Sequence, residues 1–218
     1  MEKSKIVIRQ EDKSEWHRTE YLTKKAFWNL NMPGCDEHYL VHKIRTDSSY
    51  IPELSRVAVL GDEIVGAIFY ERAHILHEGK KHEVLTFGPL CVDPACQKHG
   101  IGKMLLTHTM QVAREAGHRA IVICGVPAYY PKFGFLTCDH YGITMPDGSN
   151  FDAFMGIDLV EGTLASLSGI FYEPEIMHDY PSEEVDRFDL SFPRMEKKIL
   201  PGQWRTPDDS KGISPQKS

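Results

Sequence analysis

The spacing of hydrophobic side chains near the amino terminus predicts one strand followed by two helices. The run at 5–9, KIVIR, has the β-branched composition of a strand. From residue 12 to about residue 30, apolar residues recur at intervals of three and four, and Asp12 or Ser14 can cap the helix that this interval predicts. The interval returns from 36 to about 46, after the helix-ending sequence NMPG.

Between residues 55 and 92 the pattern changes to β-rich runs that are separated by tight turns. The runs at 55–60 and 63–70 flank Gly61 and Asp62, so they predict a hairpin. A further turn around 78–80 returns the chain into a strand at 83–92. The middle of the chain therefore contributes neighbouring strands of a sheet.

The segment from 83 to 124 predicts a strand, a helix and a second strand. The helical stretch at 100–116 carries an apolar stripe, and Gly117 stands where a left-handed cap would end it. The run at 120–124, AIVIC, is continuously apolar, as in parallel strands that are buried on both faces. Such a unit crosses over right-handed and places the turn before its helix at the carboxyl end of the first strand.

Length and composition fit one large α/β domain with an extension at its carboxyl end. The chain has 218 residues, with 41% hydrophobic and 26% charged, which is ordinary for a globular protein that buries a core. We expect a short helical piece at 128–133 and a strand at 151–160. Beyond residue 168 the sequence turns acidic and aromatic, so we divide the chain into a domain at 1–165 and a partly ordered extension at 166–218.

Charge and hydropathy exclude several classes of partner. A net charge of −6 and a pI near 6.0 oppose attraction to a phosphate backbone, so we expect no nucleic-acid partner. The start MEKSKIVIRQED has no apolar signal region, and no segment approaches the roughly 20 apolar residues that span a bilayer. We expect a cytoplasmic protein without a membrane partner. A homodimer is the commonest soluble oligomer, and the sequence leaves the oligomeric state open.

Five cysteines without a C-x-x-C motif indicate reduced thiols rather than a disulfide framework. Cys91 and Cys96 with His99 can be read as metal ligands, but their spacing fits no common zinc pattern. His38 and His42 can share a helix face in the same way, without a third ligand near them in sequence. We therefore expect no metal.

The segment QKHGIGK at 97–103 places glycines directly between the predicted strand and the predicted helix. The first N–H groups of a helix lack intrahelical partners and lie at the positive end of its dipole, so such a turn can bind an anion. Gly100 and Gly102 would let a pyrophosphate approach the backbone closely. A tight turn that only starts a helix stays an alternative. The third glycine of a Rossmann turn and the Gly-Lys-Ser/Thr of a P-loop are both missing.

Two motifs in this region resemble the GNAT superfamily of N-acetyltransferases. The run LCVDPACQKHGIGKMLL at 90–106 is similar to the family's acetyl-CoA signature, Gln/Arg-x-x-Gly-x-Gly/Ala after a strand that ends in V-x-P. The run AYYPKFGF at 128–135 is similar to the next family motif, in which a tyrosine stands four residues before a Gly-Phe pair. The resemblance covers about residues 5–160 and is greatest to the predicted acetyltransferases often called YhbS-like.

The resemblance implies an α/β fold with a mixed, mostly antiparallel central sheet, one splayed pair of parallel strands and helices on both faces. Acetyl-CoA would bind as cosubstrate between the splayed strands. Gly88-Pro89 offers a cause for the splaying, because proline removes a ladder donor and invites a bulge; alternatively Pro89 marks an edge strand. The residues implied in cofactor binding are Leu90, Cys91, Val92, Gln97, Lys98, His99, Gly100, Ile101, Gly102, Lys103, Tyr130 and Phe133.

The reaction that the resemblance implies is direct transfer of an acetyl group to an amine in a ternary complex. Tyr130 is in the position that often supplies the acid, whereas Tyr129 is expected to pack or to contact the outer part of the cofactor. Many relatives carry a glutamate base where this chain has Thr86. The alternatives for the base are water, Glu71 at the end of its predicted strand, Glu83 and His74.

Two further departures concern the cofactor and the route of transfer. Gly125 stands where the family frequently has an asparagine. A covalent acetyl-cysteine at Cys91 is another route, but sequence places no histidine beside this residue, so direct transfer is favoured.

The acceptor stays open between a small-molecule amine and a protein amine, and a non-catalytic sensor of CoA or acyl-CoA is the alternative function. A nucleotide-binding regulator is a second alternative. The acidic residues of the extension can attract a cationic substrate; they are Glu173, Glu175, Asp179, Glu183, Glu184, Asp186 and Asp189. Its aromatic residues can instead pack on the domain or on a second subunit; they are Phe171, Tyr172, Phe188 and Phe192.

Overall fold

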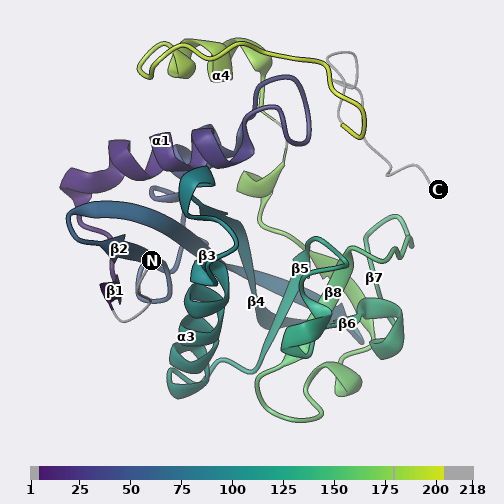
Figure 1. The fold of residues 1–218 in the computed structure, drawn as a ribbon. Coiled ribbons are helices and arrows are strands. Elements are labelled where there is room, and N and C mark those ends of the chain that lie inside the picture. The colour runs from purple at the N-terminus through teal and green to yellow at the C-terminus, as the bar shows by residue number, and fades with distance from the viewer. Residues whose placement is uncertain (1–4, 179, 204–218) are drawn as a thin grey trace.

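One mixed sheet organises the molecule, and its strands follow the order β1-β2-β3-β4-β5-β8-β6 (Figure 1). The computed structural model describes residues 5–178 and 180–203. The strands are β1 (Ile6–Arg9), β2 (Arg56–Leu60), β3 (Glu63–His77), β4 (Lys80–Val92), β5 (Ala120–Cys124), β6 (Leu136–Thr137), β7 (Ile143–Thr144), β8 (Phe154–Asp158) and β9 (Gly169–Tyr172).

The pairing is antiparallel at most positions, as predicted. β4 and β5 run parallel, and so do the short strands β7 and β9. Between β4 and β5 the described ladder contains a single pair, Leu85 opposite Ile121, whereas β3 and β4 stay paired from Gly66 to His77. The parallel strands therefore part immediately beyond Leu85, which confirms the splayed pair.

Helices cover both faces of the sheet, because alternate residues of β3 point to opposite sides. Phe69 packs with α1 and α2, and Tyr70 with α3. The Tyr70 hydroxyl lies 2.9 Å from Oγ1 of Thr109 in α3. Figure 1 shows α1 and α3 on opposite sides of the strands, with α4 outside α1. The helices are α1 (Trp16–Phe27), α2 (Glu37–Ile44), α3 (Ile101–Glu115) and α4 (Ser182–Asp189).

Two local expectations differ from the structure. β3 continues to His77 instead of ending near Tyr70, because its last residues pair with both β4 and β9. The expected helical piece at 128–133 is reduced to a 3₁₀ turn at Pro131–Phe133. Pro131 supplies no N–H to an earlier turn, and Gly134 ends the segment with a φ of 97°.

The extension packs on its own domain. β9 pairs with β3 through Ile170, Phe171 and Tyr172, and the Phe171 side chain is fully buried. Farther along, the buried ammonium group of Lys24 in α1 lies 2.6 Å from Oδ1 of Asp189. The division at residue 165 stays a prediction, and most of the tail expected to be loosely ordered lies outside the described residues. No helix within 5–178 and 180–203 has the length and apolar character to cross a bilayer.

Candidate active site

A β-bulge in β4 opens the sheet at the position of Gly88-Pro89. Leu90 is opposite Ile68 and Phe87 is opposite Tyr70, so β4 carries one residue more than β3 across this interval. Because β4 lies between β3 and β5, the alternative that Pro89 marks an edge strand is wrong. The bulge and the parting of β4 from β5 therefore coincide.

Backbone donors of β4 face the opening. The N–H of Asp93 donates to the carbonyl of Val65 at 2.9 Å, so it points toward β3. Since successive N–H groups of a strand point to opposite edges, those of Leu90 and Val92 point toward β5. An extended amide chain such as pantetheine can pair with such donors as an added strand does.

The turn at 97–102 brings its backbone to the start of α3. Gly100 caps the helix with a φ of 85°, which a glycine adopts without strain, and Lys98 has a φ of 63°. The side chains of Gln97, Lys98, His99 and Lys103 are exposed around it. A groove of about 440 Å³ begins at the same turn; its lining is Ile8, Gly100, Lys103, Met104, Thr107 and His108. Free N–H groups at a helix start and flanking cations suit a diphosphate.

Two tyrosines occupy the space that two glycines leave free. A Cβ on Gly102 would lie 3.0 Å from the Tyr129 hydroxyl, so Tyr129 reaches the first turn of α3. A Cβ on Gly125 would lie only 2.3 Å from Cε2 of Tyr130. The asparagine that the resemblance led us to look for at position 125 is therefore incompatible with this position of Tyr130.

Tyr130 lies at the inner side of the opening. Its ring packs against Phe87 of β4 and Phe135, with ring centroids 5.8 Å and 5.5 Å away, and little of it is exposed. Burial, with a smaller effect of Tyr129, raises the pKa of Tyr130 above that of an ordinary phenol. Its hydroxyl group therefore keeps its proton at neutral pH and can act as a hydrogen-bond donor.

Glu71 lies on the other side of the opened strands and is fully buried in the middle of β3. Within the described part of the chain, neither oxygen of its carboxylate has a hydrogen-bond partner. Its backbone is paired with Thr86, so the two side chains are neighbours on one face. Burial, and to a smaller extent Glu173 and Asp47, raise the pKa of Glu71 well above its usual range. Burial disfavours the charged form of this carboxyl group, and a cation bound next to it would stabilise that form.

Comparisons with known proteins agree with this arrangement. The acetyltransferase (GNAT) family matches residues 12–135, which is more than half of the chain. The chain belongs to the GNAT acetyltransferase family. It is 31% identical over 99 residues to the uncharacterized N-acetyltransferase YjhQ of Escherichia coli strain K12, a match that spans 45% of this chain and 55% of YjhQ. It is 25% identical over 134 residues to the uncharacterized N-acetyltransferase YhbS of the same organism, spanning 62% of this chain and 78% of YhbS.

Solved structures of GNAT proteins share the fold. The E. coli YhbS structure, in complex with CoA, has a TM-score of 0.71 at 22% identity and covers 81% of this chain and 94% of that protein. A GNAT acetyltransferase from Brucella melitensis, in complex with acetyl-CoA, has a TM-score of 0.64 at 23% identity and covers 79% and 98%. The GNAT fold with its splayed strands is thus the architecture of this chain.

Glu83 and His74 were also considered as the base of this GNAT protein, and neither is buried as Glu71 is. Glu83 is exposed and within 3.7 Å of Nε of Arg72. His74 stacks on Tyr172, with ring centroids 5.1 Å apart. Of the three side chains considered, only Glu71 is fully buried, and the expectation that it stands at a strand end is wrong because β3 continues past it.

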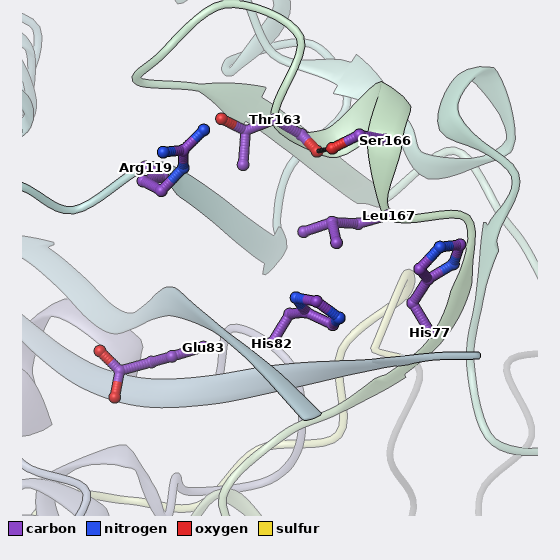
Figure 2. A pocket seen from close by; sticks show the side chains of 7 residues that line it. All are labelled: His77, His82, Glu83, Arg119, Thr163, Ser166 and Leu167. Carbon is purple, nitrogen blue, oxygen red and sulfur yellow. Dashed lines mark hydrogen bonds between the residues drawn. The ribbon is translucent and has the colours of Figure 1, made fainter. Parts of the chain in front are cut away.

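A second hollow lies at the opposite end of β5, away from the opening. Figure 2 shows Arg119 and Thr163 on one side of it and His77 and His82 on the other. Its volume is about 430 Å³. Arg119 immediately precedes β5, whereas the parted strands lie toward the carboxyl end of β5. This hollow therefore takes no part in the GNAT site.

The cysteine alternatives find little support in the geometry. The Cys91 side chain is buried on the α1 side of the sheet, 3.6 Å from Oγ1 of Thr23, and burial raises its pKa to about 11. A thiol with that pKa is a poor nucleophile at neutral pH. Among the described residues no group of three His, Cys, Asp or Glu side chains is arranged to hold a metal ion.

Three residues near the opening were not singled out by sequence reasoning as site residues. Glu173 is close enough to both Glu71 and Cys124 to help raise the pKa of each. Met177 places Cε 3.2 Å from where a Cβ on Gly88 would stand. The acidity of the extension was the only signal, and it did not distinguish Glu173 from its neighbours.

Proposed function

We propose that this GNAT protein is an acetyl-CoA-dependent N-acetyltransferase that acts by direct transfer to an amine. The observation that carries the proposal is the buried, unpartnered carboxylate of Glu71 beside the parted strands. Glu71 lies directly across from Thr86, so a carboxylate on the neighbouring strand can replace the one that the family resemblance led us to expect at position 86. A sensor that only binds CoA does not need a proton acceptor that is shielded from water.

The residues present fit acetyl-CoA, which supplies the acetyl group as a thioester when bound. The N–H groups of Leu90 and Val92 can hold the pantetheine amides, and the turn around Gly100 can hold the diphosphate. The exposed side chains of Lys98 and Lys103 add positive charge near that turn. The side chain of Cys91 points to the α1 face, so of this residue only the backbone is available to the cofactor.

Proton transfer can be assigned to two residues. The acceptor amine arrives as an ammonium ion and must lose two protons while the C–N bond forms and the C–S bond breaks. Glu71 accepts the first proton, which makes the amine a nucleophile, and later releases it to solvent. Tyr130 donates its proton to the leaving sulfur and regains one from the nitrogen, so CoA departs as a thiol. Because burial raises the pKa of Tyr130, it is protonated before each turnover.

The test measures binding and turnover separately. Titration calorimetry with acetyl-CoA should show binding, and a thiol-release assay should show amine-dependent formation of CoA across a panel of primary amines. Binding of CoA without thiol release from any amine would make the chain a sensor. Absence of CoA binding would end the proposal.

A further inference from the structure

One face of the sheet changes from apolar to polar within a single step along four neighbouring strands. The apolar side chains belong to one buried cluster and are Ala73 of β3, Val84 of β4, Val122 of β5 and Phe171 of β9. Side chains on one face recur every second residue. Two residues farther on, in the direction of the opening, the same face presents Glu71, Thr86, Cys124 and Glu173.

Glu173 brings a second carboxyl group from the extension into this polar layer. It follows Tyr172, the last residue of β9, which is opposite His74 of β3, and it is only partly accessible. It is close enough to Glu71 and Cys124 to affect the pKa of both groups. The Cys124 side chain is exposed, yet desolvation by the surrounding protein raises its pKa well above the usual value.

The charges that act on this layer are predominantly negative. The titratable groups of other elements that interact electrostatically with Glu71 are Glu173, Asp47, Tyr50 and Tyr180. None of them is a cation. Glu173 faces the exposed His178, which can carry a positive charge only when protonated. Burial opposes the ionisation of both carboxyl groups, the negative charge of Glu173 further opposes that of Glu71, and neither group has a basic side chain paired with it in the described chain.

The extension also reaches the bulge of β4 close to this polar layer. Its turn at Glu175–Met177 brings the Met177 methyl group against the bulge of β4 at Gly88. This turn therefore lies beside the bulge, two residues along β4 from Thr86 of the polar layer. A cationic group bound at this layer would lie close to both carboxyl groups.

We propose that Glu71 and Glu173 together form the acceptor site, and that this site takes a cationic primary alkylamine that carries no carboxylate. The inference rests on the proposed acetyltransferase function. An ammonium ion between the carboxylates supplies the cation that both lack and relieves their repulsion. A carboxylate on the acceptor would add a third negative charge at short range. Glu173 is the specificity-determining residue, and Glu71 remains the base.

The experiment compares butylamine with 4-aminobutanoate, which has a chain of the same length with a carboxylate at its far end. Thiol release is measured with the wild-type chain, Glu173→Gln and the control Glu175→Gln, which removes the same charge from an exposed position of the same segment. We expect the wild type to prefer butylamine by about tenfold or more in kcat/KM. We expect Glu173→Gln to raise KM for butylamine about tenfold and to change kcat less than about threefold. The ratio of kcat/KM for butylamine to that for 4-aminobutanoate should become smaller than in the wild type.

Three results would overturn the inference: equal use of both amines by the wild type, an unchanged KM in Glu173→Gln, or an equal loss in Glu175→Gln. If neither amine is acetylated, calorimetric titration of butylamine into the CoA complex replaces turnover, and no binding overturns the inference. If CoA itself does not bind, the proposed function fails. Titration of butylamine into the free chain, with Glu173→Gln as comparison, then still tests the carboxylate pair by itself.

Discussion

The two sides of the opening between β4 and β5 differ in the groups that they present, backbone on one side and side chains on the other. On the side where acetyl-CoA is expected, the groups are backbone N–H donors and a glycine turn, all within residues 88–102. On the side where the amine is expected, the groups are side chains of β3, β4 and β5 and of the residue after β9. A backbone site has to be encoded locally, whereas a side-chain site is assembled only when distant segments fold together.

The largest effect that this contrast predicts is loss of turnover on replacement of the base. Glu71→Gln keeps the size of the side chain but cannot accept a proton, so kcat should fall about 10³-fold. The affinity for acetyl-CoA, measured by calorimetry, should stay close to that of the wild type. Glu83→Gln is the matched control, because Glu83 is exposed on β4 and should matter little. Equal losses in the two variants would remove Glu71 from its role.

Replacement of the acid should have the next largest effect. Tyr130→Phe keeps the ring that packs on Phe87 and Phe135 but removes the donor, so kcat should fall about 10²-fold. The dissociation constant of acetyl-CoA should change little. Turnover at the wild-type rate would exclude Tyr130 as the acid.

The backbone side should respond to conformation more than to charge. Gly100→Val places a β-branched residue at a φ of 85° and should weaken CoA binding about tenfold. His99→Ala removes a neighbouring side chain without this strain and should weaken binding about threefold or less. Calorimetry with CoA measures both. A larger loss in His99→Ala would mean that side chains, and not the backbone, hold the diphosphate.

The smallest predicted effect concerns stability and pH. Since burial raises the pKa of Glu71, unfolding releases a proton between its ordinary pKa of about 4.3 and its folded value, and stability falls as pH rises through this interval. Glu71→Gln removes the ionisable group and with it this loss of stability at higher pH. At pH 7 its melting temperature should exceed that of the wild type, by about 2–4 °C for each kcal/mol, and the difference should shrink toward pH 4. A variant that is less stable than the wild type at pH 7 would contradict the buried, unpartnered carboxyl.

Sequence patterns were most informative where the signal is local. The apolar stripe and Gly117 predicted α3 to within a residue or two, and the Gly88-Pro89 step predicted the bulge of β4. The true length of β3 was not apparent from its sequence. Charged and polar residues such as Arg72 and His74 interrupt the apolar run, and only pairing with β4 and β9 keeps the strand continuous.

The acceptor side was the part that sequence could not supply. Glu71 looked like an exposed residue at a strand end, and Glu173 looked like one acidic residue among several. Each becomes distinctive through a residue of another segment: Glu71 is opposite Thr86 of β4, and Glu173 is close enough to Cys124 of β5 to affect its pKa. Burial of this kind depends on contacts between segments far apart along the chain, which periodicity does not report.

The pairing of β9 with β3 has a consequence for truncated forms of this chain. β9 pairs with one edge of β3 from His74 to Leu76, and Tyr50 forms a bridge with Glu71 farther along the same strand. A fragment that ended at residue 165 would expose this edge of β3. Strands of other molecules could then pair with it, so we expect the fragment to aggregate. A fragment that ended at Tyr172 would keep β9 but lose Asp189, and the buried ammonium group of Lys24 would then have no carboxylate beside it.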